Sequence, residues 1–171
     1  MSRERVVGII LYGDVKDEKN CWEKWISYAK SISIELNCKL THFAIVCDGM
    51  DGELKTLSRS EKKLLRIINS DKRIDSISFS ALKKGFTSIL DDEICLILNS
   101  KNKYVYCEIP LEKYNEFLGK RILSELGSFI RCKKSEIFSM DKNQVAFNYV
   151  MKGKGYDIKQ YPTLEILYSE P

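Results

Sequence analysis

The residues best suited to chemistry in this chain are acidic, and they gather in two short segments. The segments contain Asp48, Asp51 and Glu53, and Asp91, Asp92 and Glu93. Carboxylates so close together could hold a hard cation or contact a basic surface of another protein. The first segment does not match the calcium loop, in which acidic residues at alternate positions precede the glycine. We therefore predict no metal site and interpret both segments as candidate partner-binding residues.

Imidazole chemistry would have to use His42, the only histidine in the chain. Strand alternation places His42 on the same face as Ala44 and Val46, with Cys47 on the opposite face. The nearest thiol is thus badly placed for a nucleophile and base pair, so we expect a half-buried structural histidine. The sequence also lacks a Gly-x-Ser-x-Gly elbow, a dinucleotide fingerprint and a phosphate loop. No catalytic residue and no cofactor is predicted.

The six cysteines follow no metal-binding pattern. They are Cys21, Cys38, Cys47, Cys95, Cys107 and Cys132. No Cys-x-x-Cys spacing and no Cys/His cluster occurs among them, and several fall within apolar segments. We expect reduced, buried thiols that pack as small hydrophobic side chains.

Length and composition indicate one α/β domain over residues 1–171. The chain is 44% hydrophobic and 30% charged, which is typical of a soluble globular protein with one core. Its net charge of +4 is spread without a basic block, so we predict neither a nucleic-acid nor a membrane partner. No apolar stretch is long enough to cross a bilayer and the first residues do not resemble a secretory leader, so we expect a cytoplasmic protein.

The first half of the chain reads as strand, helix, strand, helix, strand. Apolar residues predict strands at 6–12, 40–47 and 74–79, and helical spacing predicts helices over 20–36 and 58–68. Each helix begins with a capping-box pattern. A helix between successive strands normally makes a parallel crossover, so these three strands are predicted to run the same way.

The second half repeats this order after an antiparallel hairpin. Strands at 93–98 and 104–109 form the hairpin, and a helix over 110–129 follows. A strand at 135–140, a short helix at 141–150 and an edge strand at 164–168 complete the prediction. The fold class is thus a single-domain mixed β-sheet with helices packed on it, in two successive βαβαβ-like halves.

Two classes of function remain open on these residues. If the first three strands are parallel, the loops after them gather at one end of the sheet, where open α/β sheets bind ligands. A small-molecule-binding or enzymatic domain would then use Asp14 and Asp48 as its carboxylates. No base, nucleophile or phosphate cradle joins them, which favours a protein whose surface is its function.

The chain resembles the small cytoplasmic immunity proteins that bacteria encode beside polymorphic or contact-dependent toxins. The resemblance rests on its length, on an α/β pattern without catalytic motifs, and on the segments Cys21-Trp22-Glu23-Lys24-Trp25 and Leu40-Thr41-His42-Phe43. It implies a non-enzymatic protein that neutralises a cognate toxin domain by direct contact. The acidic residues would be natural contacts for the basic cleft of a nuclease toxin.

Overall fold

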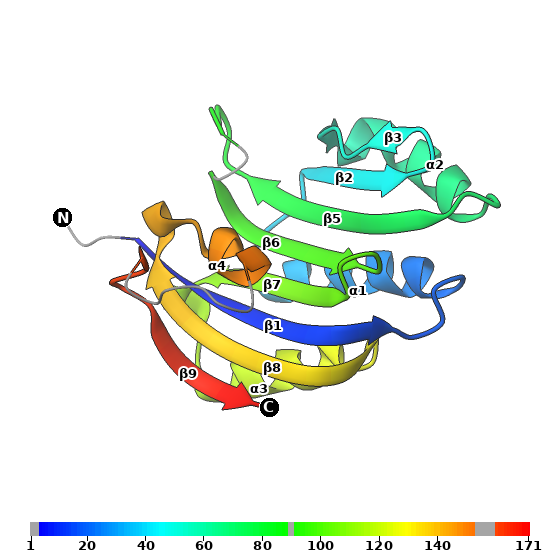
Figure 1. Cartoon of the computed structure of the whole chain (residues 1–171). Helices are drawn as coiled ribbons and strands as arrows, with labels where there is room; N and C mark the ends of the chain where they lie inside the picture. Colours follow the sequence, from blue (N-terminus) through cyan, green and yellow to red (C-terminus); the bar gives the residue numbers. More distant parts are fainter. Residues whose placement is uncertain (1–3, 89–90, 153–159) are drawn as a thin grey trace.

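The computed structural model describes residues 4–88, 91–152 and 160–171 (Figure 1). Its strands are β1 (Arg5–Val15), β2 (His42–Cys47), β3 (Met50–Asp51), β4 (Lys55–Thr56), β5 (Ile74–Leu82), β6 (Asp92–Asn99), β7 (Tyr104–Pro110), β8 (Ile130–Asp141) and β9 (Glu165–Glu170). Its helices are α1 (Cys21–Glu35), α2 (Leu57–Ile68), α3 (Glu116–Leu126) and α4 (Ala146–Lys152), with 3-10 turns η1 (Leu111–Lys113) and η2 (Lys142–Gln144).

All nine strands form one sheet, in the order β3-β2-β5-β6-β7-β1-β8-β9, with β4 also paired to β2. Every strand pair within the described residues is antiparallel. The α/β class and the hairpin of β6 and β7 are confirmed, whereas the predicted parallel crossovers and mixed sheet are wrong. The two-half arrangement is not confirmed, because β1 lies between β7 and β8.

The parallel prediction fails because of the segment 50–56, which returns the chain along β2. Asp51 pairs with Val46 near the end of β2, and Thr56 pairs with His42 at its start. Helix α2 therefore begins beside the start of β2 and runs back, so that β5 starts where β2 ends. This additional reversal makes β2 and β5 antiparallel neighbours. The acidic segment at Asp48–Glu53 is thus partly an edge strand.

One face of the sheet is covered by α1, α2 and α3 and holds the main core (Figure 1). Trp22 and Trp25 are buried there, as helical spacing predicts, and the Trp25 indole N–H donates to the Ile77 carbonyl at 3.0 Å. β1 contributes Val7, Ile9 and Leu11 to this core, so it is covered on this side.

Helix α4 lies on the other face of the sheet (Figure 1). A second, smaller hydrophobic cluster lies beneath it. Phe138 and Val150 are buried in it, and Phe138 meets Tyr149 edge to face with 4.8 Å between ring centroids. The ring of Phe138 lies over Gly8 of β1, where an added Cβ would come within 2.3 Å of it. Gly8 is therefore required for close packing of this cluster on the sheet.

The helix boundaries differ from the predicted caps. Asn20 precedes α1 without a side-chain capping bond, and α2 starts at Leu57, one residue before the predicted cap Ser58. The helix predicted from Pro110 begins only at Glu116, where the Asn115 side chain accepts from the Leu118 N–H at 2.8 Å. The predicted edge strand is β9, at the outer side of β8. Among the described residues, no helix is long and apolar enough to cross a membrane.

Candidate functional site

A groove lies on the second face of the sheet, beside the cluster under α4. Its floor consists of alternate residues of three neighbouring strands, in register. Ser80, Cys95 and Glu108 form one row across β5, β6 and β7. Parallel to it run the row of Ser78, Ile97 and Tyr106 and the row of Ser76, Asn99 and Tyr104. All nine residues line the same cavity of about 400 Å³.

The groove is hollow because its floor changes from small to large side chains. The serines of β5, together with Ala44 and Val46 of β2, leave space above the sheet. On the other side, Phe147 and Met151 of α4 form a wall. A cavity of this size is within the range of sites that bind small molecules or single side chains.

Glu108 is the principal carboxyl group at the floor of the groove. The Tyr106 hydroxyl donates to its Oε2 at 2.6 Å. Burial, and then the charge of Asp92, raise the pKa of Glu108 to about 7, although the Tyr106 hydrogen bond and Lys142 oppose this shift. Glu108 can therefore exchange a proton near neutral pH.

Asp92 is the second buried carboxyl group of the groove. Burial raises its pKa to about 6, against the opposing effects of Lys142 and of a hydrogen bond with Cys95. The Lys142 ammonium donates to the backbone carbonyl of Asp92. Burial also raises the pKa of the Cys95 thiol. This thiol is thus protonated at neutral pH, which makes it a poor nucleophile.

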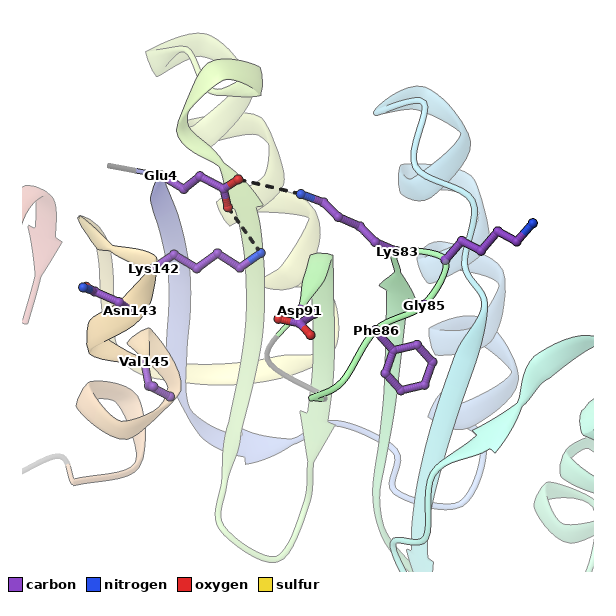
Figure 2. Close-up of a pocket in the computed structure, with 9 residues that line it drawn as sticks. Glu4, Lys83, Gly85, Phe86, Asp91, Lys142, Asn143 and Val145 are labelled. Carbon is purple, nitrogen blue, oxygen red and sulfur yellow. Dashed lines mark ion pairs between the residues drawn. The ribbon is translucent and has the colours of Figure 1, made fainter. Parts of the chain in front are cut away.

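A second hollow, of about 590 Å³, adjoins the groove and shares Lys142 and Val145 with it (Figure 2). Figure 2 shows Glu4 between two lysines, with carboxylate-to-ammonium distances of 3.8 Å to Lys83 and 3.9 Å to Lys142. These contacts hold Lys142 at the rim of the groove. Asp91 lies beyond it, and its carboxylate accepts from the Thr87 N–H at 2.9 Å.

Val145, between η2 and α4, has left-handed backbone angles (φ 56°, ψ 82°). A β-branched residue rarely adopts this conformation, and it costs about 1–3 kcal/mol. The turn places Lys142 at one end of the groove and α4 along its side. The strained residue thus lies at the boundary between the two hollows.

The structure separates the two predicted acidic segments. Asp48 lies beyond the end of β2, whereas Asp92 begins β6, and the strand register places these positions at opposite ends of the sheet. Asp51 and Asp92 both line the groove. The other four predicted residues lie elsewhere. Asp48 and Glu53 are exposed at the hairpin, Asp91 lines the adjoining hollow, and Glu93 faces a pocket at the start of β1.

The carboxylates of the enzymatic alternative are also kept apart. Asp14 lies near the end of β1 and Asp48 follows β2, which runs the same way, but β5, β6 and β7 lie between these two strands, a separation of about 19 Å. The Asp14 carboxylate forms ion pairs with the ammonium groups of Lys103 at 2.9 Å and Lys133 at 3.3 Å. The predicted gathering of loops after the first three strands is therefore wrong, because the segment after β5 lies at the other end.

His42 is half-buried on the face of β2 that carries Ala44 and Val46, as predicted. Its Nδ1 lies 2.8 Å from the Thr41 hydroxyl, and its ring meets Phe86 at 5.1 Å between centroids. Cys47 points to the opposite, helix-covered core. The predicted half-burial of the histidine and its separation from Cys47 are confirmed.

Glu108 and Lys142 are absent from the predicted set of site residues. A signal for Glu108 exists in β7, where Tyr104, Tyr106 and Glu108 alternate with apolar residues. Serine alternates with apolar residues in β5 in the same way. Lys142 gives no such signal, because it lies in the turn after β8 and meets the groove only through the tertiary fold.

Comparison with protein-family models, with curated proteins and with solved structures found no match to this chain.

Proposed function

We propose that this chain is an immunity-type binding protein that neutralises a cognate bacterial toxin domain in the cytoplasm by direct contact, without catalysis of its own. The observation that carries the proposal is the acidic groove on the second sheet face. It offers a partner buried carboxyl groups beside aromatic and small side chains. Such a surface can receive a protruding segment of another protein, and its charge disfavours nucleic acid as the partner.

The site residues support binding better than turnover. The Cys95 thiol is held protonated, and His42 lies two strands away from it across β5. The carboxyl groups of Asp92 and Glu108 could transfer protons, but no described residue beside them is an activated nucleophile. A small cationic molecule remains the second candidate ligand, which the cavity of about 400 Å³ favours.

The test is complex formation with the toxin domain encoded directly upstream of this chain's gene. Isothermal titration calorimetry should give a one-to-one complex of submicromolar affinity, and toxin activity should disappear at equimolar ratio. The groove variant Ser78→Trp should weaken the complex, whereas Ser31→Trp on the exposed side of α1 should not. Absence of a complex with the folded toxin domain would contradict the proposal.

A further inference from the structure

The charge of the groove is opposite to that of the whole chain. The groove is lined by the carboxyl groups of Asp51, Asp92 and Glu108 and by one ammonium group, that of Lys142. The chain itself carries a net charge of +4. The buried carboxyl groups of this cavity must either stay protonated or gain local compensation from a cation, because buried carboxylates are costly when they are not paired.

Lys142 does not supply this compensation within the described residues. Its ammonium donates to the backbone carbonyl of Asp92, and its ion pair is with Glu4, at the rim. No ion pair between Lys142 and the carboxylate of Asp92 or Glu108 is found in the described part of the chain. The lysine lowers the pKa of both carboxyl groups, yet both remain raised.

Glu108 retains the capacity to accept further hydrogen bonds. Among the described residues, its only hydrogen-bond donor is the Tyr106 hydroxyl, which is bound to Oε2. Oε1 has no donor from the described chain, and the residue lines the cavity. A carboxylate that holds one donor on one oxygen can still bind a guanidinium group through the other.

The floor of the groove also matches the shape of a basic side chain. The strands β5 and β7 lie about 10 Å apart, with β6 between them. Ile97, which is partly exposed, provides apolar surface in the middle of the floor. The aliphatic part of an arginine or lysine packs well on such surface, with its charged group placed toward the carboxylates.

We propose that the acidic end of the groove, at Glu108 and Asp92, receives the side chain of an arginine or lysine that protrudes from the partner protein. This inference rests on the proposed function and names the chemistry by which the partner is recognised. The serines of β5 leave room for the side chain, and the carboxylates bind its cationic group. The interaction would exclude water and place a charged pair at the centre of the interface.

Proton release should accompany binding. The groups that face Glu108 are Asp92 and Cys95 of β6, Tyr106 of β7 and Lys142 of η2, with Asp51 on the far side of the groove. A bound cation favours the ionised carboxylate and lowers its pKa. Affinity should therefore rise as pH increases from about 6 to 8, by up to about tenfold per pH unit for each proton released.

The first experiment measures the affinity of the complex with the toxin domain for three variants. Glu108→Gln and Asp92→Asn should each weaken the wild-type affinity by about thirtyfold or more. The matched control, Glu23→Gln, removes a carboxylate from the exposed, opposite side of the protein on α1 and should leave affinity within about twofold. Circular dichroism and thermal unfolding establish that each variant folds.

The second experiment uses the protein alone with two small probes, Nα-acetyl-arginine amide and Nα-acetyl-citrulline amide. The probes differ only in a guanidinium group against a neutral urea. The arginine probe should shift the amide resonances of Cys95 and Glu108 at millimolar concentration, and the citrulline probe should not. Glu108→Gln should abolish the shifts.

The outcomes separate the two proposals. If the wild-type protein forms the complex and Glu108→Gln binds with the same affinity, the proposal that a basic side chain binds in the groove is overturned. The proposed function is left intact. Equal shifts from the two probes likewise overturn the proposal of a basic side chain. If the arginine probe binds in the groove but no complex forms, the proposed function fails. The groove is then a site for a small cationic molecule, and the proposal that the basic side chain comes from a partner protein is overturned.

Discussion

Two tyrosine–glutamate pairs on the same face of the sheet occupy contrasting surroundings. Under α4, the Tyr149 hydroxyl donates to Glu136, whose exposed fraction is only 7%. In the groove, the hydroxyl of the fully buried Tyr106 donates to Glu108, which is only partly covered and lines an open cavity. The glutamate of the pair is thus enclosed in the covered half and accessible from the cavity in the open half.

The difference arises from the residues around each pair. Aromatic rings fill the covered half, where Tyr149 packs against Phe138 and Tyr161. In the open half β5, the second strand from β7, contributes Ser78 and Ser80, which fill little space. Packing therefore determines which glutamate can be reached by a partner.

The largest expected effect is the loss of packing in the covered half. Phe138→Ala should lower the free energy of unfolding by about 3–5 kcal/mol, because Phe138 is fully buried and its truncation removes apolar burial and leaves a cavity. Ile97→Ala, on the half-exposed floor of the groove, should cost less than about 1.5 kcal/mol. Urea denaturation measures both variants. Equal losses would show that the groove floor is packed as tightly as the covered cluster.

The second largest expected effect is the difference between removing the Tyr149 hydroxyl and removing the Tyr106 hydroxyl. Tyr149→Phe leaves buried Glu136 without its tyrosine donor and should cost about 1–3 kcal/mol. Tyr106→Phe should cost less than Tyr149→Phe, because Tyr106 is itself buried but its acceptor Glu108 is only partly covered, so that water in the groove can reach the carboxyl group. Chemical denaturation at pH 7 tests the difference, and a reversed order would contradict the distinction between a covered and an open pair.

The sequence predicts most elements of this fold but not the way they are joined. Continuous apolar runs predict β1 and the hairpin of β6 and β7, because a strand buried on both faces has few polar residues. The direction of β5 is mispredicted because the segment 50–56, which is too short and too polar to read as strands, carries the chain back along β2.

The candidate site is predictable only in part for the same reason. Asp51 and Asp92 are acidic residues in short polar segments, and both line the groove. Strand alternation only weakly indicates Glu108, and no sequence pattern predicts that β5 and β7 lie on the two sides of β6. Long-range pairing decides which residues meet, and local patterns do not contain it.

The third prediction concerns pH and follows from the raised pKa of Glu108. The folded chain binds this proton more tightly than the unfolded chain, so the stability that it contributes is complete below the ordinary pKa of about 4.5. It is lost as pH rises through about 7. Wild-type protein should lose about 1–2 kcal/mol over this window, less than the shift alone implies because water enters the groove.

Glu108→Gln provides the comparison for this pH dependence. The amide imitates the protonated carboxyl group and can still accept from Tyr106, so the variant should be as stable as wild type near pH 4.5 and more stable near pH 7.5. Urea denaturation of both proteins at each pH gives the difference. A wild-type stability that falls equally in the variant would assign the pH dependence to other groups, of which Asp92 is the first to examine.

The smallest expected effect is on the serines that keep the groove open. Ser78 is half-buried, and no hydrogen bond to its side chain is found within the described residues. Ser78→Ala should therefore change the free energy of unfolding by less than about 0.5 kcal/mol. Thermal unfolding, calibrated against Phe138→Ala, is sensitive enough to establish this bound. A loss above about 1 kcal/mol would mean that the Ser78 hydroxyl is part of a packed, hydrogen-bonded floor. The open half would then be packed as tightly as the half beneath α4.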